Sequence, residues 1–297
     1  MWTETLFQHP LTRLAELQRA DSLWSSDCFV GGRDDGLVSS LVAAALVEFA
    51  LSNHGSADQR ALAGDMARSA TLKLSLREAG ATGSEMDEGI DCVTSYLVLR
   101  LLEQLDQLPR TDTIFPAAHR PDAVVRHPSL RSFLNLKLGR DLVGQPTEMD
   151  AVRVLTLHRA GEIDQAKLAD LWRVRFAGEQ GWDGTWDNVT GLGYGLATCI
   201  MVMLWTAAGR PAPRPRPVHI TAQETLFERC NLVMALAKID GEAARAPATQ
   251  IFQSMAADVQ WGRVGPLTCA AALKLSAEMA QHAPAAATRP AALRLVS

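Results

Sequence analysis

The alternation of two kinds of helical segment is the feature that most constrains the fold of this chain. Apolar residues recur with the period of an α-helix, and strand-like alternation bounded by hairpin turns is nearly absent. Apolar segments rich in Ala and Leu are expected to form helices at roughly 36–51, 91–105, 150–160, 188–206, 222–238 and 266–280. More amphipathic segments are expected to form helices at roughly 6–20, 57–77, 128–139, 163–176 and 247–258.

These two kinds of helix predict two layers. A helix that is apolar on all sides is buried, whereas a helix with one polar face contacts solvent. Buried helices that are mostly followed by surface helices are typical of a closed (α/α)6 toroid, in which helical hairpins surround a central cavity. We therefore predict an all-α chain, with one toroid domain over residues 1–285 and an Ala- and Pro-rich tail over residues 286–297.

A proline-rich segment, Arg210-Pro-Ala-Pro-Arg-Pro-Arg-Pro217, takes the place of the fifth outer helix. Proline has a fixed φ and no amide hydrogen, so this density of prolines excludes a helix and favours an extended polyproline conformation. We expect a long connector that runs over the outside of the domain.

The bulk composition excludes several classes of protein. The formal net charge is −4, and charged residues make up 21% of the chain, so the sequence has no electrostatic footprint for nucleic acid. Residues 1–4 do not begin a signal peptide, and the longest apolar stretches, 37–50 and 192–208, contain too many polar interruptions to span a membrane. The five cysteines are scattered and odd in number, which indicates reduced thiols and a cytoplasmic protein.

Four of the predicted buried helices open with an aspartate, followed in three of them by a similar short sequence. Each aspartate stands where a helix needs an N-cap, which accepts hydrogen bonds from otherwise unpaired amide groups. This weak internal repeat favours a fold of repeated helical hairpins. The four residues are Asp35, Asp91, Asp150 and Asp187.

The most specific local feature is Gln180-Gly-Trp-Asp-Gly-Thr-Trp186, which precedes a predicted buried helix. It matches the Gln-x-x-x-Gly-x-Trp form of the QW motif and resembles the repeats of squalene–hopene cyclases, oxidosqualene cyclases and related prenyltransferase-like toroids. The resemblance implies that Gln180 bonds the end of one helix and that Trp186 stacks on it to clamp the next hairpin. Residues 260–268 resemble a degenerate second copy.

A chain with room for one such domain resembles the single-domain class II terpene cyclases that act on linear isoprenoids or prenylated aromatic compounds. The resemblance implies an apolar isoprenoid substrate, a reaction that begins with protonation of an alkene or epoxide, and no metal or other cofactor. It also allows peripheral contact with a membrane during substrate uptake.

The acid that such a reaction needs is not obvious, because the Asp-x-Asp-Asp motif of class II cyclases is absent. The nearest match is Glu148-Met-Asp150-Ala, which places Asp150 at the donor position with Glu148 beside it. Asp91, at the end of Asp87-Glu-Gly-Ile-Asp91, is a second candidate. Helix capping explains these aspartates equally well, and the two roles conflict, because a capping carboxylate has a lowered pKa.

Aromatic side chains on the buried helices are candidates for the cavity wall, where they would stabilise carbocations by cation–π attraction. Only 6% of the residues are aromatic, so ordinary core packing is the competing interpretation for each of them. The candidates are Phe49, Tyr96, Tyr194, Trp205 and Phe227.

Two metal-dependent alternatives find little support in the sequence. The zinc site of protein prenyltransferases needs Asp-x-Cys, whereas Asp27-Cys28 and Asp91-Cys92 are adjacent pairs. A class I terpene synthase needs a second magnesium-binding box, which is missing, and the histidines lack ligand spacing. The remaining alternative is a non-catalytic toroid that binds a lipid or a partner protein.

Overall fold

The computed structural model describes residues 5–25, 35–80, 147–159, 161–187, 193–221, 223–257 and 264–281. All regular secondary structure in these ranges is helical, which confirms the all-α prediction. The helices are α1 (Thr5–Leu17), α2 (Asp35–Leu51), α3 (Ala57–Gly80), α7 (Glu148–Arg159), α8 (Gln165–Leu171), α9 (Tyr194–Ala207), α10 (Leu226–Ile239), α11 (Gly241–Ala257) and α12 (Pro266–Gln281). A π-helical turn (Trp172–Phe176) and a 3₁₀ turn (Ala177–Glu179) extend α8. The helices expected at 91–105 and 128–139 and the tail at 286–297 lie outside the described residues.

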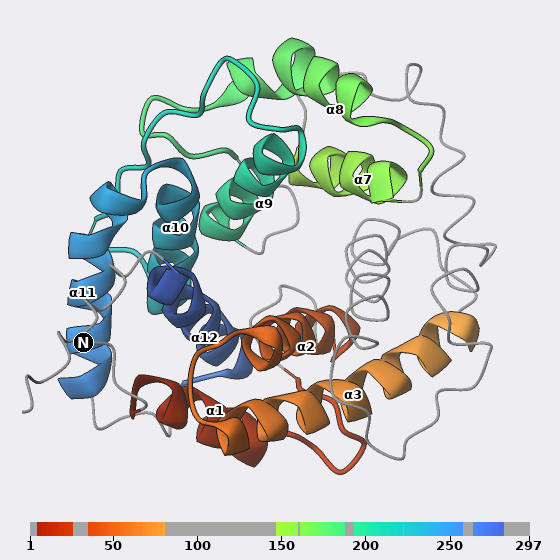
Figure 1. Cartoon of the computed structure of the whole chain (residues 1–297), viewed down its shortest axis with the longest axis vertical. Helices are drawn as coiled ribbons and strands as arrows, with labels where there is room; N and C mark the ends of the chain where they lie inside the picture. Colours follow the sequence, from red (N-terminus) through yellow and green to blue (C-terminus); the bar gives the residue numbers. More distant parts are fainter. Residues whose placement is uncertain are drawn as a thin grey trace, which may run out of the picture.

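The helices form two layers (Figure 1). The inner layer is an arc in which α7 contacts α9, α9 contacts α10, α10 contacts α12, and α12 contacts α2. The outer layer consists of α8, which packs against α7, together with α11 against α10, α1 against α12, and α3 against α2. Both layers were expected from the alternation of apolar and amphipathic segments.

Burial differs between the layers as the apolar patterns predict. Every residue of α9 from 195 to 202 is buried. The outer helix α11 instead buries one stripe at the spacing of a single helical face, and this stripe packs with residues of α10 and α12. The stripe consists of Ala244, Ala248, Ile251, Phe252 and Met255.

Two helix starts differ from the prediction by six residues each, more than the other starts do. The helix α9 begins at Tyr194 rather than at 188, after Gly193 with a φ of 96°. The helix α11 begins at Gly241 rather than at 247, because the Asp240 carboxylate accepts hydrogen bonds from the amides of Glu242 and Ala243, both at 3.1 Å.

The expectation that each opening aspartate is an N-cap is wrong for two of the four. Asp150 is the third residue of α7, and its Oδ2 accepts a hydrogen bond from the Thr147 amide at 3.1 Å, while its own amide donates to Thr147 Oγ1 at 3.4 Å. This is a capping box, with Thr147 as the cap. Asp187 is exposed and precedes α9 by several residues. Asp35 is the first residue of α2, and Asp91 lies outside the described residues.

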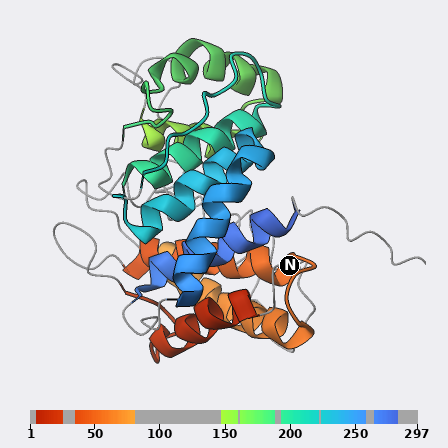
Figure 2. The ribbon, with the colours of Figure 1, turned by 90° about the vertical axis from the view of Figure 1, so that its left-hand side faces the viewer.

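The proline-rich connector has no helix, as predicted, and Figure 2 shows it as an extended loop. Two buried tryptophans hold it against the helices. The indole of Trp205 donates to the Pro211 oxygen at 2.9 Å, and that of Trp172 donates to the Pro213 oxygen at 3.0 Å. The connector is therefore anchored to both α9 and the end of α8.

Candidate functional site

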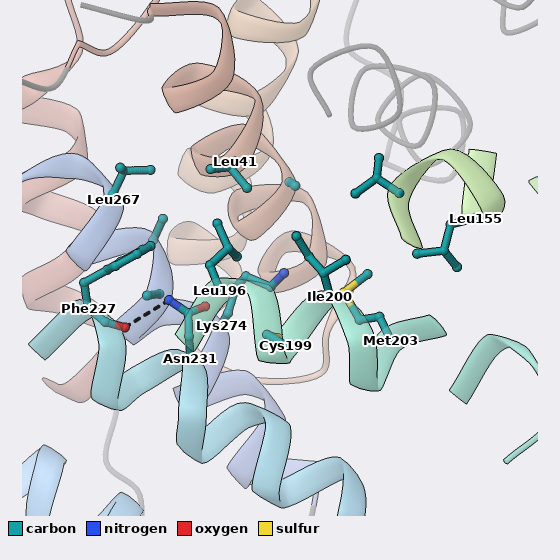
Figure 3. A pocket seen from close by; sticks show the side chains of 14 residues that line it. Leu41, Leu155, Leu196, Cys199, Ile200, Met203, Phe227, Asn231, Leu267 and Lys274 are labelled. Carbon is teal, nitrogen blue, oxygen red and sulfur yellow. Dashed lines mark hydrogen bonds between the residues drawn. The ribbon is translucent and has the colours of Figure 1, made fainter. Parts of the chain in front are cut away.

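A cavity lies inside the arc of inner helices, and all five of them contribute to its wall (Figure 3). The volume that the centre of a water molecule can occupy inside it is about 60 Å³. All of the empty space between the lining atoms amounts to about 710 Å³ when the open side is included. The lining residues are Leu41 and Ala44 of α2, Val152 and Leu155 of α7, Leu196, Cys199, Ile200 and Met203 of α9, Phe227 and Asn231 of α10, and Leu267, Ala270, Ala271 and Lys274 of α12.

The cavity wall begins near the amino-terminal ends of three helices. The lining positions begin at the second or third residue in α9, α10 and α12 and extend to residue 203 of α9, 231 of α10 and 274 of α12. Eleven of the fourteen lining side chains are hydrocarbon or thioether groups, so the wall suits an apolar molecule.

Three polar side chains interrupt the apolar wall: Cys199, Asn231 and Lys274. The Lys274 ammonium lies 3.4 Å from a carboxylate oxygen of Glu48, on α2. A second ion pair joins Lys238 and Glu278 at 2.8 Å, on α10 and α12. The part of the cavity beside Cys199 is therefore close to two balanced ion pairs.

Burial and the charges of the two ion pairs together shift the pKa values of Cys199 and Lys238. Burial raises the pKa of the Cys199 thiol, although the nearby charges of Lys274 and Lys238 oppose that change. Burial would lower the pKa of Lys238, but its contact with Glu278 outweighs that effect, so the pKa is raised. Cys199 is thus a neutral thiol, and Lys238 remains a cation.

The two predicted acids of α7 lie in different environments. Glu148 is 1% exposed, whereas Asp150 is half-buried and takes part in the capping box at Thr147. Glu148 precedes Val152 and Leu155 by four and seven residues, so all three share one helical face, although Glu148 does not line the cavity itself. Asp91 lies outside the described residues.

Of the five predicted aromatic wall residues, Phe227 lines the cavity. Phe49 packs on Phe7, with the ring centroids 5.0 Å apart. Trp205 faces the connector, where the Arg210 guanidinium lies 5.6 Å over its ring. Neither Phe49 nor Trp205 lines this cavity, and Tyr96 lies outside the described residues.

Tyr194, the remaining aromatic candidate, lies beside an acidic pair at the start of α9 rather than in the cavity wall. Burial and the neighbouring Glu224 raise the pKa of Tyr194 to about 12. Glu228 accepts a hydrogen bond from the Gly195 amide at 2.6 Å, and a Cβ on Gly195 would overlap the same carboxylate. Burial raises the pKa of Glu228 despite this hydrogen bond.

The QW-like segment forms a loop that Gln180 holds together. The buried Gln180 amide donates to the Gly184 oxygen at 2.7 Å and to the Arg216 oxygen at 3.0 Å, and its Oε1 accepts from the Arg216 amide at 2.7 Å. Gln180 therefore binds the proline-rich connector rather than the end of a helix, which corrects the role implied by the resemblance.

Trp186, the last residue of the motif, is 2% exposed. Its indole donates to the Phe176 oxygen at 3.2 Å, and its ring packs on Trp172 with centroids 6.1 Å apart. Its amide donates to Thr198 on α9 at 3.1 Å. Trp186 thus joins the end of the α8 segment to the inner helix α9.

Sequence reasoning missed Asn231 and Lys274, although both carry a signal. Each is a polar residue inside an otherwise apolar run, within 230–237 and 269–275 respectively. The aliphatic lining residues carry no such signal, because the same residues fill ordinary cores.

Within the described ranges, no group of three or more His, Cys, Asp or Glu side chains is placed to hold a metal ion. No helix in those ranges combines the length and the apolar character needed to cross a bilayer. No protein-family model matches this chain, and no curated protein is significantly similar to it.

Proposed function

We propose that the chain binds an apolar small molecule in the cavity between α2, α7, α9, α10 and α12. The observation that carries this proposal is the shared apolar wall, to which all five inner helices of the arc contribute side chains. Ligand sites of this kind are concave and mostly apolar, with a few polar groups that fix orientation. The polar groups here are Asn231, Lys274 and Cys199.

The proposal includes the closed toroid as the architecture of the whole chain. The inner arc has α7 at one end and α2 at the other, and the sequence predicts a further apolar helix at 91–105 between them along the chain. The QW-like loop supports this interpretation, because Trp186 links an outer segment to an inner helix.

Titration with N-phenyl-1-naphthylamine, a neutral dye that fluoresces in apolar sites, tests the binding function. Ala270 lines the cavity, so Ala270→Leu fills it and is expected to weaken dye binding about tenfold or more. Ala272→Leu is the matched control, because Ala272 is also buried on the same helix but does not line the cavity. Equal dye affinity in the wild type and Ala270→Leu would place the dye elsewhere.

Protonation-initiated cyclisation of an isoprenoid is the second candidate, and one observation favours it. Glu148 is a buried carboxyl group on the α7 face that carries the cavity residues Val152 and Leu155. In such a reaction the carboxylic acid gives its proton to a terminal alkene, and the resulting carbocation closes rings before it loses a proton. The substrate and the product are isomers, and in this second candidate Phe227, an aromatic residue of the cavity wall, stabilises the cation.

Incubation with linear isoprenoids and prenylated aromatic compounds, followed by NMR of the products, tests this second candidate. NMR is needed because cyclisation leaves the mass unchanged. Glu148→Gln is expected to abolish product, while Glu162→Gln, at an exposed position, is expected to leave product formation unchanged. A fully active Glu148→Gln variant would remove Glu148 from the mechanism.

A further inference from the structure

We infer that the ligand of the central cavity is an apolar alcohol, whose hydroxyl group binds between Asn231 and Lys274. This inference rests on the proposed binding function and adds the chemical class of the ligand. In it, the hydroxyl hydrogen is donated to Asn231 Oδ1, and the hydroxyl oxygen accepts a hydrogen bond from Lys274 Nζ.

The orientation of the Asn231 amide is fixed by its neighbour. Asn231 is 3% exposed and lines the cavity, and its Nδ2 donates to the main-chain oxygen of Phe227 at 2.9 Å (Figure 3). A carbonyl oxygen only accepts hydrogen bonds, so the nitrogen of the amide must lie on that side. Within the described ranges no donor is paired with the other atom, Oδ1, which leaves an acceptor on the cavity wall for a ligand.

Lys274 supplies the complementary donor. Its ammonium group carries three N–H donors, and its 3.4 Å distance from Glu48 is longer than a good N–H···O hydrogen bond. Asn231 and Lys274 line the same small cavity and stand on α10 and α12, which contact each other. One small polar group can therefore meet both side chains.

The surrounding charges favour a neutral head group over a carboxylate. Lys274 and Lys238 already face Glu48 and Glu278, so the four charges balance. A carboxylate would bring an unbalanced negative charge into the cavity. It would also place one of its oxygens against Asn231 Oδ1, and neither of these two oxygens can donate a hydrogen bond. A hydroxyl group both donates and accepts, so it satisfies the two side chains at once.

A ligand without a donor is expected to bind more weakly for a different reason. An ether can accept a hydrogen bond from Lys274, but it covers the Asn231 oxygen without giving it a donor. Sites built around a hydroxyl group discriminate against analogues that lack it, because the buried polar group of the protein is then unpaired.

Displacement of N-phenyl-1-naphthylamine by three matched probes tests the inference. The probes are geraniol, geranic acid and geranyl methyl ether, which share one isoprenoid chain and differ at the head group. We expect geraniol to bind the wild-type protein about tenfold more tightly than either of the others. Asn231→Leu is expected to remove the preference for geraniol over the ether, and Lys274→Met is expected to weaken geraniol binding.

Lys238→Met is the matched control, because Lys238 belongs to the same group of ion pairs but does not line the cavity. It is expected to keep the preference for geraniol. Circular dichroism identifies any variant that fails to fold, and the ranking of the probes on the wild-type protein then decides alone.

The outcomes separate the inference from the proposed function. If neither the dye nor any probe binds, the binding function and the inference both fail. If the dye binds but geraniol has no advantage, or geranic acid binds best, the cavity remains a ligand site and the hydroxyl inference is overturned. Retention of the preference in Asn231→Leu overturns it as well.

Discussion

The side chain of Gln180 holds the main chain of Arg216 at two points, 36 residues further along the chain. Its Oε1 accepts a hydrogen bond from the Arg216 amide at 2.7 Å, and its Nε2 donates to the Arg216 oxygen at 3.0 Å. The same Nε2 also donates to Gly184 within the loop. One buried amide thus satisfies backbone groups of both the QW-like loop and the proline-rich connector, which have no helix or strand partners of their own.

Gln180→Ala is therefore expected to destabilise the protein by about 2–4 kcal/mol, since it removes three hydrogen bonds and leaves buried backbone groups unpaired. Urea denaturation gives the free energy of unfolding. Gln223→Ala, at an exposed position, is the control and should change it by less than about 0.5 kcal/mol. Equal effects of the two substitutions on the free energy of unfolding would contradict the role of Gln180 in joining the loop to the connector.

Gly184 allows the connector to pass against the loop. It has a φ of +83°, and a Cβ at this position would overlap the main-chain oxygen of Pro217. Gly161 has a similar φ of +77°, but a Cβ added there would meet no atom within 4 Å. A substitution at Gly161 therefore measures the cost of backbone strain alone, without a steric clash. We expect Gly161→Ala to cost about 1 kcal/mol and Gly184→Ala about 3 kcal/mol or more, measured by urea denaturation. Similar losses of unfolding free energy in the two variants would show that the main chain at Pro217 moves aside for the added Cβ at no further cost.

The sequence predicted the inner helices well where the apolar pattern and the local terminus agree. The helix expected at 266–280 is observed at Pro266–Gln281, because a proline at the first position suits a helix start. The start of α9 was missed because it depends on a distant residue: Glu228 accepts the Gly195 amide from a helix about 30 residues later. Periodicity alone contains no information about such a contact.

The cavity was predictable only in outline, since the sequence does not give the rotation of each helix about its axis. Successive residues are about 100° apart, so Trp205 is about 200° around α9 from the cavity residue Met203 and faces the connector instead. Phe49 is about 80° around α2 from Leu41 and about 140° from Ala44, and it packs against Phe7 instead. An aromatic residue on a buried helix is thus not by itself evidence of a cavity wall.

Thiol chemistry offers a direct check on access to the cavity. Cys199, Cys230 and Cys269 are all buried free thiols, and burial raises the pKa of Cys230 and Cys269 to about 12. Only Cys199 of these three lines the cavity. We expect the uncharged reagent N-ethylmaleimide to modify Cys199 faster than the other two, as mapped by mass spectrometry. Geraniol should slow modification of Cys199 and leave the other two unchanged; equal rates at all three thiols would indicate global unfolding instead of entry through the cavity.

The pH dependence of stability tests the environment of Glu228. Burial raises the pKa of this carboxyl in the folded protein, so the folded state binds the proton more tightly than the unfolded state. Its contribution therefore favours folding at pH values below the ordinary glutamate pKa of about 4.3, and it is lost as the pH rises through the folded pKa. Glu228→Gln keeps an oxygen that can accept the Gly195 amide but cannot ionise. Urea denaturation from pH 4 to pH 7 should accordingly show the stability of Glu228→Gln rising relative to the wild type as the pH increases. Parallel stability curves would mean that Glu228 has the same pKa in the folded and unfolded states. The hydrogen bond from the Gly195 amide, which lowers the pKa of Glu228, would then offset the effect of burial.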